Sequence, residues 1–295
     1  MDTIEIMNRN IFMCASDLAV ITGHNPYKEK DEIILKYWKK HFKADYVETK
    51  LYMKKNKISE KVEESYMECI ERISKENNID LKSVKTDLYK CLNTKDTENL
   101  QKEKEQLIKK VLNKLPQKHK EEFKESVNHI TNTQFGIRFE NNGVDIYMQK
   151  TGNSVEKSPK YHKEELFIID NEIDGVMDVW TVGGKVDGIA TDKDGNKIIL
   201  EIKNRVNKLF NNIRDYEKVQ CYAYMYALDI NSVHLSEILK SRKNNTMNIF
   251  EINFDDTFWQ KEIVDNISLF VDNFYEFLSN KKRKIELLRN NPSLN

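Results

Sequence analysis

The sequence has few residues that interrupt secondary structure, and it has no long apolar run. Only 9 glycines and 4 prolines occur among 295 residues, which leaves little room for long disordered linkers. No apolar stretch approaches the roughly 20 residues of a membrane-spanning helix, and the N-terminus lacks the basic head and apolar core of a signal peptide. These absences predict a soluble, folded protein of the cytoplasm.

Cysteine is also sparse. The four cysteines lie far apart without any C-x-x-C spacing, at Cys14, Cys69, Cys91 and Cys221. Scattered cysteines argue against a zinc or iron–sulfur site and against a disulfide framework. A reducing, intracellular setting therefore fits best.

The charge of the chain is balanced. The 48 lysines and arginines match the 48 aspartates and glutamates, so the formal net charge is 0. Nothing global therefore indicates a polyanion as partner, and nucleic-acid binding would depend on a local basic surface. Hydrophobic residues at 39% and aromatic residues at 10% allow one large domain, or a core domain with an elaboration.

A region rich in lysine, glutamate and asparagine extends from about residue 45 to residue 130. Apolar residues such as Ile70, Ile73, Leu107 and Val111 recur there at helical spacing. We predict several helices at the periphery of the core. The charge runs, for example 102–110, are typical of solvated helix faces, with DNA contact as the alternative.

The segment 183–205 reads as a β-hairpin. Residues 192–196 supply a turn between apolar, β-branched flanks. Glu201 and Lys203 are two residues apart, so they point to one face of the second strand, and Asp187 lies across the turn. Two carboxylates and a lysine are thus expected to converge.

Neighbouring carboxylates repel unless a cation separates them or one takes up a proton. Oxygen ligands of this kind suit Mg²⁺, which keeps waters and accepts one or two carboxylates together with substrate phosphate. The lysine could position or deprotonate a water. The alternative is that all three are solvated charges on an amphipathic hairpin.

Two helices flank the hairpin in the chain. The pattern over 119–150 places Gly136 and Glu140 four residues apart on one helix face, where the glycine would let another backbone approach. Glu140 is either a surface glutamate or a third acidic ligand. The pattern over 211–228 places Gln220 on the same side as Tyr224. A glutamine on a helix is usually solvated, and the tyrosine-rich face is either core or a base-stacking platform.

The remaining patterns predict further strands and helices. We expect strands at 165–170, 176–182, 185–191 and 197–203, which would form an antiparallel sheet with Leu166–Ile169 buried. Strands are also expected at 233–239 and 249–253, followed by one long helix over 258–288.

A short helix is expected to begin at Ser16 and to end at Gly23, before a second helix over 31–41. Ser16 fits a plain N-cap. A hydroxyl at a helix N-terminus is also suited to a phosphate, because the free N–H groups and the dipole favour an anion, and Arg9 lies just upstream. Both interpretations of Ser16 remain open.

Four stretches, in this order, resemble the motifs of one family: an N-terminal Ser-Asp…Gly-x-Asn-Pro-Tyr signature, a G-x-x-x-E helix, Asp-Gly and Glu-x-Lys strands, and a glutamine helix. In this chain, the N-terminal signature is Ala15–Tyr27, and the G-x-x-x-E helix is Gly136–Glu140, followed by Tyr147 and Thr151–Gly152. The Asp-Gly and Glu-x-Lys strands are Gly184–Gly188 and Leu200–Lys203, and the glutamine helix is Gln220–Ala227. The order of elements resembles the αβββαβ core of the PD-(D/E)xK nuclease superfamily. Within it, the chain is most similar to the YqaJ-like viral recombinase, or lambda exonuclease, family.

The resemblance implies a mixed α/β (α+β) fold with a restriction-endonuclease-like core, in which helices flank a central mixed β-sheet. We expect an N-terminal helical segment of the nuclease domain at 1–44, a helical elaboration at 45–130, and the nuclease core with a C-terminal helix at 131–295. The four motifs lie outside 45–130, so the role of that region stays open.

The resemblance also implies a metal-dependent deoxyribonuclease. One or two Mg²⁺ ions, replaceable by Mn²⁺, would be bound by Glu140, Asp187, Glu201 and the backbone carbonyl of Ile202. Lys203 would orient and help to deprotonate a water, and Gln220 would fix the nucleophile or the lysine.

Members of the family degrade double-stranded DNA from 5′-phosphorylated ends in the 5′→3′ direction, in viral or phage-type recombination or repair. By resemblance, Ser16 and Arg9 would hold the 5′-phosphate. Many relatives have Ser-Pro where this chain has Lys185-Val186, which makes Lys185 a candidate DNA contact, and Arg205 is another.

Several alternatives remain. An endonuclease on the same core and a catalytically idle DNA-binding module are both compatible with the motifs. A single-strand annealing protein is an expected partner, and a ring-shaped homotrimer and a monomer are both open.

Overall fold

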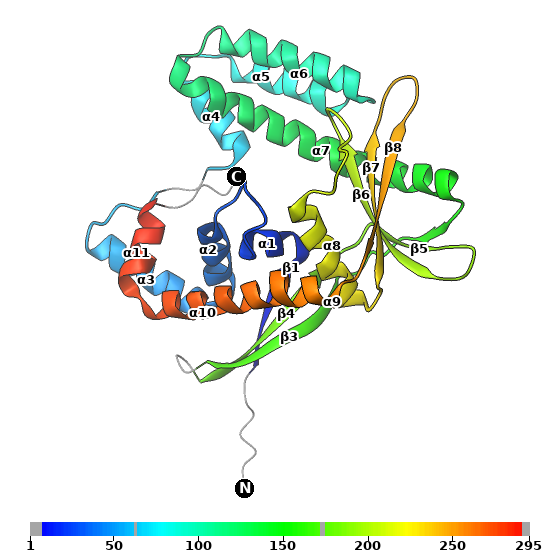
Figure 1. The fold of residues 1–295 in the computed structure, drawn as a ribbon. Helices are drawn as coiled ribbons and strands as arrows, with labels where there is room; N and C mark the ends of the chain where they lie inside the picture. The colour runs from blue at the N-terminus through cyan, green and yellow to red at the C-terminus, as the bar shows by residue number, and fades with distance from the viewer. Residues whose placement is uncertain (1–7, 62–63, 172–174, 291–295) are drawn as a thin grey trace.

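The computed structural model describes residues 8–61, 64–171 and 175–290. Its helices are α1 (Ala15–Ile21), α2 (Lys30–His41), α3 (Lys43–Lys55), α4 (Tyr66–Glu76), α5 (Leu81–Leu92), α6 (Thr97–Leu112), α7 (Gln117–Thr151), α8 (Asp215–Leu228), α9 (Asp256–Phe258), the π-helix η1 (Trp259–Val264), α10 (Asp265–Ser279) and α11 (Lys281–Asn290). Its strands are β1 (Asn8–Cys14), β2 (Ser154–Glu156), β3 (His162–Asn171), β4 (Val176–Gly184), β5 (Gly188–Thr191), β6 (Lys197–Arg205), β7 (Ser232–Leu239) and β8 (Thr246–Asn253). The mixed α/β fold and the predicted order of helix, strands, helix and strand are confirmed (Figure 1).

The strands form two sheets, whereas a single antiparallel sheet was expected for the segment 165–203. One sheet has the order β1-β4-β3, and the other has the order β2-β5-β6-β7-β8. The predicted hairpin is present as β5 and β6, but the chain leaves the first sheet after Gly184 and enters the second at Gly188. The predicted strand at 185–191 is therefore shorter, and Asp187 lies in the connection.

The first sheet corrects two expectations. Its parallel pairing of β1 with β4 gives residues 8–14 a strand that was not predicted. The segment Leu166–Ile169 is not buried, because β3 is the edge strand and Ile168 remains 60% exposed. An edge strand has a neighbour on one side only, so apolar side chains along it can stay partly exposed.

The C-terminal segment is not one long helix. Short α9 and the π-helical turn η1 lead into α10, and Asn280 then interrupts the helix with extended dihedral angles, φ −107° and ψ 94°. The periodic apolar residues are nevertheless buried, among them Ile263, Ile267 and Phe270. Periodicity identified the buried face correctly, but it carries no information about a single extended residue that redirects the chain.

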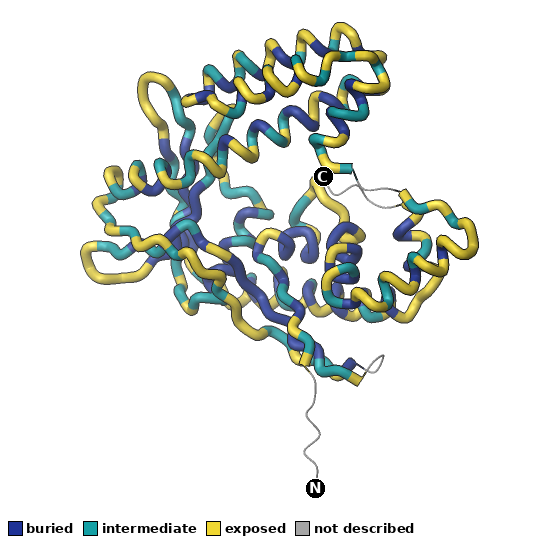
Figure 2. Tube along the Cα trace, turned by 180° about the vertical axis from the view of Figure 1, so that it is seen from behind, coloured by how far each residue is buried: buried dark blue, intermediate teal, exposed yellow. Residues whose placement is uncertain are grey.

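The apolar residues fall into three clusters of buried side chains. The largest joins the N-terminal and C-terminal helices to β4, β7 and α8, as illustrated by Trp38, Trp180 and Phe274. A second cluster fills the helices α4–α7, including Ile70 and Phe123. The third lies between α7 and the five-stranded sheet. In Figure 2, buried residues gather along the strands, whereas the outer helices are exposed along one side.

Helix α7 links the last two clusters. Its first half packs Phe123 and Val127 into the helical region, and its second half packs Val144 and Tyr147 onto the sheet. Close packing on β6 depends on Gly143, since a Cβ there would lie 2.6 Å from Ile202 Cγ2. The approach that we had expected at Gly136 is thus made at Gly143, because a Cβ at Gly136 would meet open space.

The predicted helices between residues 45 and 130 are confirmed. Met53 of α3 joins the largest cluster rather than the cluster of α4–α7, and α7 runs without interruption past residue 130. The division of the chain at 44 and 130 stays a prediction. Among the described helices, none is long and apolar enough to cross a membrane.

Candidate active site

The predicted hairpin residues meet where β6 extends beyond the end of β5. The last pair of this hairpin is Gly188 with Leu200, so the β5-side edge of β6 is open from Glu201 onward. The backbone N–H of Ile202 donates to Asp187 Oδ2 at 2.6 Å. Because the N–H and C=O of one strand residue point to the same edge, the carbonyl of Ile202 also faces this opening.

Asp187 carries a carboxylate in an environment that disfavours its charge. Burial, followed by the negative charge of Glu201, raises the pKa of Asp187 well above its usual range, and Glu140 adds to this effect. Its hydrogen bond from Ile202 and the charge of Lys203 act in the opposite direction but do not compensate. Lys203 therefore supplies too little positive charge to offset the burial of Asp187 and its two neighbouring carboxylates.

Glu201, Lys203 and Gln220 form a hydrogen-bonded group. Lys203 Nζ donates to Glu201 Oε1 at 2.7 Å and to Gln220 Oε1 at 3.0 Å. Gln220 Nε2 lies 3.3 Å from Glu201 Oε1 and 2.7 Å from the hydroxyl of Tyr224. Burial alone would lower the pKa of Lys203, but the charge and hydrogen bond of Glu201 outweigh it, so the pKa lies above its ordinary value. Lys203 is therefore an ammonium group with one N–H left for another acceptor.

Glu140 completes the acidic group from α7. It lines a cleft of about 310 Å³, and the cleft also contains Asp187, Glu201 and Lys203. The amide of Asn204 donates to the carbonyl of Gly136 at 3.1 Å, which ties the end of β6 to α7 beside Glu140. The described residues around this cleft are Asn132, Thr133, Gly136, Ile137, Glu140, Asp187, Glu201, Ile202, Lys203, Asn204 and Arg205.

The donor set of the cleft fits a hard divalent cation. The ligands on offer are the carboxylates of Glu140, Asp187 and Glu201 and the carbonyl of Ile202, all of them oxygen. Mg²⁺ and Mn²⁺ prefer such oxygen ligands, whereas zinc sites are usually rich in cysteine or histidine. The raised pKa of Asp187 supports the same conclusion, because burial and nearby carboxylates without a compensating cation favour the neutral acid.

Tyr224 was not predicted as a site residue, although it lies four residues after Gln220. Gly184 makes room for it, since a Cβ there would lie 2.8 Å from Tyr224 Cε1 and 3.5 Å from Ala15 Cβ. Burial, and next the charge of Glu201, raises the pKa of Tyr224, so its hydroxyl stays protonated. The i, i+4 spacing was the signal that could have identified it.

Ser16 is not an N-cap. Helix α1 begins at Ala15, so Ser16 is its second residue, and the exposed Ser16 hydroxyl lies 3.4 Å from Cys14 Sγ. Its neighbour Ala15 lies beside Gly184, because a Cβ on Gly184 would lie 3.5 Å from Ala15 Cβ. Ser16 is absent from the described residues that line the cleft.

The three predicted basic DNA contacts have different surroundings. Lys185 is exposed in the connection that carries Asp187. Arg9 lies at the other end of β1 from Ser16 and donates to both oxygens of Asp178, at 2.6 and 3.1 Å. Asp178 is fully buried, so this ion pair anchors β1 to β4, and the structure does not bring Arg9 to Ser16.

Arg205 also serves the fold. Its guanidinium donates to Glu217 Oε2 at 2.8 Å and to Glu237 Oε1 at 2.7 Å, and the side chains of these glutamates are only 3% and 1% exposed. Two buried carboxylates need this one cation, so we do not retain Arg205 as a DNA contact. The prediction missed these partners because both are remote in sequence.

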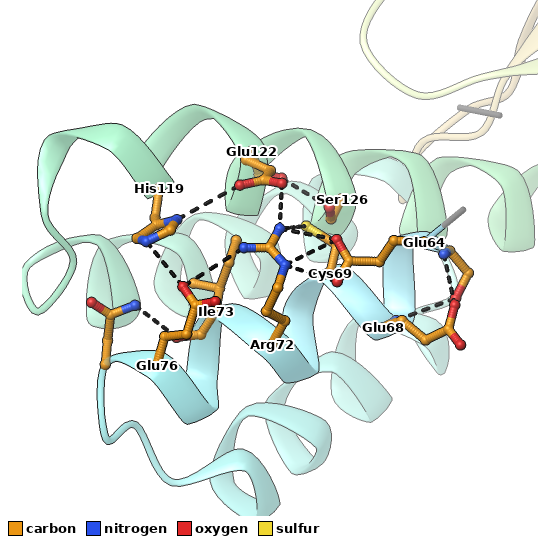
Figure 3. Close-up of polar contacts among 11 residues, drawn as sticks. Glu64, Glu68, Cys69, Arg72, Ile73, Glu76, His119, Glu122 and Ser126 are labelled. Atoms are coloured by element: carbon orange, nitrogen blue, oxygen red, sulfur yellow. Dashed lines mark hydrogen bonds and ion pairs between the residues drawn. The ribbon is translucent and has the colours of Figure 1, made fainter. Parts of the chain in front are cut away.

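A second acidic group lies in the helical region (Figure 3). The carboxylates of Glu64 and Glu122 and the thiol of Cys69 have ligand atoms within 4.8 Å of one another. Arg72 lies among them, with Nε 2.8 Å from Glu64 Oε1 and a second hydrogen bond from its guanidinium to Glu122. Hydrogen bonds that Arg72 donates to Glu64 raise the pKa of Arg72, and burial raises the pKa of Cys69. A permanent cation and a protonated thiol make this group unsuited to a metal.

Comparisons with known proteins agree with the motifs. The model of the YqaJ-like viral recombinase domain family matches residues 7–232, so the match also spans the helical region. No curated protein matches the chain. Among solved structures, the alkaline exonuclease LHK-Exo from Laribacter hongkongensis is 18% identical, with a TM-score of 0.33, over 67% of this chain and 90% of that chain. Its complex with dAMP gives 16% identity and a TM-score of 0.34, over 68% of this chain and 92% of that chain.

The family match covers well over half of the chain and includes every residue that the structure brings into the acidic cleft. The chain belongs to the YqaJ-like viral recombinase domain family.

Proposed function

We propose that this protein is a Mg²⁺-dependent exonuclease that degrades double-stranded DNA from 5′-phosphorylated ends in the 5′→3′ direction, in viral or phage-type recombination or repair. The observation that carries the proposal is the cleft that holds Glu140, Asp187, Glu201 and Lys203 together. Family membership supports a nuclease role. The name of LHK-Exo, an alkaline exonuclease, supports an exonuclease.

The acidic residues would hold the metal. Glu140, Asp187, Glu201 and the carbonyl of Ile202 would be the ligands of one or two Mg²⁺ ions, and Mn²⁺ could replace them. When bound, the metal lowers the pKa of a water and offsets charge on the phosphodiester oxygens. Asp187 would bind as a carboxylate, so metal binding would release the proton that its raised pKa favours.

Lys203 would orient the attacking water and stabilise charge on the scissile phosphate. Two of its N–H groups bind Glu201 and Gln220, so the third is available to an oxygen in the cleft. Help in deprotonating this water stays a prediction for Lys203, because its raised pKa depends on the charge of Glu201, which would itself bind the metal. Gln220, held by Tyr224, would keep Lys203 in this orientation.

Ser16 would bind the 5′-phosphate, as the family motif implies, because its hydroxyl is exposed in the first turn of α1. Lys185 would contact the backbone near Asp187, since it is exposed two residues away. An annealing protein as partner and a homotrimeric or monomeric state stay predictions.

The test uses linear duplex labelled at either the 5′ or the 3′ end. The wild type with Mg²⁺ should release 5′-terminal nucleotides first, faster from a phosphorylated end, and Lys203→Ala should lose this activity. Equal degradation by wild type and Lys203→Ala would contradict the proposal. Covalently closed plasmid is the second substrate, because cleavage of it would indicate an endonuclease instead.

A further inference from the structure

Helix α7 carries a row of residues that leads away from the catalytic cleft. Lys124, Asn128, Asn132, Gly136 and Glu140 follow one another at intervals of four residues, so each lies next to the following one, and the row winds around the helix by about 40° at each step. Sixteen residues of α-helix correspond to roughly 24 Å. Glu140 and Gly136 line the catalytic cleft, so this row begins at the proposed metal site and continues into the helical region.

Lys104 of α6 faces this row from the opposite helix. It is only 5% exposed, and its Nζ donates to Asn132 Oδ1 at 3.2 Å. Among the described residues, no carboxylate oxygen is recorded within 4.0 Å of Lys104 Nζ; burial lowers the pKa of Lys104, and the charge of Glu105 offsets this only in part. Burying an ammonium group with little negative charge nearby is unfavourable for folding. An anion that binds beside Lys104 would supply the missing negative charge.

The space between α6 and α7 is a groove of about 590 Å³. Lysine and amide side chains contribute most of the polar lining of the groove, and Glu105 is the one carboxylate among the described lining residues. Lys124 Nζ also lies 3.6 Å from Glu121 Oε2, but Glu121 does not line the groove. The described lining residues are Gln101, Lys104, Glu105, Ile108, Lys109, Leu112, Asn113, Lys124, Asn128 and Asn207. Lysine and amide donors are the groups with which proteins contact the sugar–phosphate backbone.

The groove and the catalytic cleft are joined. Asn132 lines the cleft and accepts the hydrogen bond from Lys104, which lines the groove. Gln101 Nε2 donates to Asn207 Oδ1 at 2.5 Å, just beyond the end of β6, so α6 is fixed to the strand that carries Glu201 and Lys203. An anion that extends from the scissile phosphate along α7 would therefore enter the groove.

We propose that one strand of the DNA substrate runs from the catalytic cleft along the α6–α7 groove, where Lys104, Lys109 and Lys124 bind successive phosphates. The proposal rests on the proposed function, because the groove continues from the place where the scissile phosphodiester would bind. A gap between two packed helices fits one backbone rather than a whole duplex. The helical region, whose role the motifs left open, would then be a DNA-binding arm of the nuclease.

The test measures DNA binding without cleavage. A fluorescein-labelled duplex with a free 5′-phosphorylated end is titrated with protein in EDTA over a series of salt concentrations, and binding is followed by anisotropy. Lys104→Met should weaken binding by about 5- to 10-fold. Adding Lys109→Gln and Lys124→Gln removes two further phosphate contacts and should reduce the slope of log K against log salt by about two more.

The thermal midpoint separates DNA binding from a structural role of Lys104. Methionine keeps most of the side-chain volume and removes the buried charge, so Lys104→Met should raise Tm by about 2–4 °C while it weakens binding. The double variant Lys109→Gln/Lys124→Gln changes two exposed side chains and should weaken binding with an unchanged Tm. The matched control is Lys102→Gln/Lys118→Gln, which removes two exposed lysines outside the groove and should match the wild type.

Affinity and salt slope equal to those of the control in every groove variant would overturn the proposal. If the groove variants bind DNA like the control while the wild type degrades linear DNA, the groove proposal is wrong and the proposed nuclease activity stands. If the groove variants bind DNA more weakly but the wild type degrades no DNA, the proposed exonuclease activity is wrong and the groove still binds DNA.

Discussion

Two acidic groups in this protein differ in what lies between their carboxylates. In the helical region, Glu64 and Glu122 both contact the guanidinium of Arg72, and their side chains remain 30% and 44% exposed. At the end of β6, the side chain of Glu201 is 7% exposed and is paired with Lys203, but Asp187 contacts a backbone N–H instead of a cation.

The difference shows how a structural ion pair and a candidate metal site can be told apart. Carboxylates that share an arginine are already neutralised, so a metal would have to displace a permanent charge. Carboxylates that are buried together without enough positive charge raise one another's pKa, as for Asp187. Among the described residues, the distances between ligand atoms alone would identify Glu64, Cys69 and Glu122 as the metal site. The balance of positive and negative charge around the carboxylates favours the cleft instead.

The strongest test of this comparison is a matched pair of substitutions. Asp187→Asn should lower the rate of DNA degradation by about 10³-fold or more, equivalent to ~4 kcal/mol, because it removes a metal ligand. Glu122→Gln should leave the rate unchanged, because its carboxylate binds Arg72. Turnover of end-labelled duplex measures both. Similar losses in the two variants would mean that the groups do not differ in function.

Arg205→Met should give the largest loss of stability. Glu217 and Glu237 are almost completely buried and would lose their shared cation, which should lower the free energy of unfolding by about 3 kcal/mol. Urea denaturation followed by circular dichroism measures it. The additional change Glu237→Gln should recover part of the loss, and no recovery would show that charge is not the cause.

Metal binding should distinguish the two groups by thermal stability. Mg²⁺ at about 100 times its Kd should stabilise the wild type by about 2.7 kcal/mol, because it binds the folded state. Glu122→Gln should keep this shift, and Asp187→Asn should lose most of it. A shift that disappears in Glu122→Gln would place the metal in the helical region instead.

Arg72→Met should have the smallest effect of the four. Its side chain is 33% exposed, so water screens the ion pairs, and the loss of unfolding free energy should be about 1–2 kcal/mol. DNA degradation at a temperature below the transition should equal that of the wild type. A large loss of activity with little loss of stability would argue that the Arg72 group takes part in function.

Much of the fold could be predicted because it depends on local patterns. The helices at 117–151 and 215–228 follow from apolar periodicity, and the β5–β6 hairpin follows from its turn residues. The spacing of Glu201 and Lys203 predicted that they share a face, and the 2.7 Å contact between them agrees. What periodicity missed was strand β1, the exposure of Ile168 and the break at Asn280, all of which depend on neighbouring elements.

The sequence by itself determined which residues could bind a metal or a phosphate, because it fixes the type and the spacing of the side chains. Only the tertiary structure decided which charged side chains are free to contact a metal or DNA. Arg9 pairs with Asp178 across 169 residues, and Arg205 pairs with Glu237 across 32, so both basic candidates serve the fold. Conversely, Lys104 reads as one charge in a solvated run, but packing buries it without a carboxylate beside Asn132. Coulomb energies depend on distance and burial in space, and neither is encoded in the order of residues.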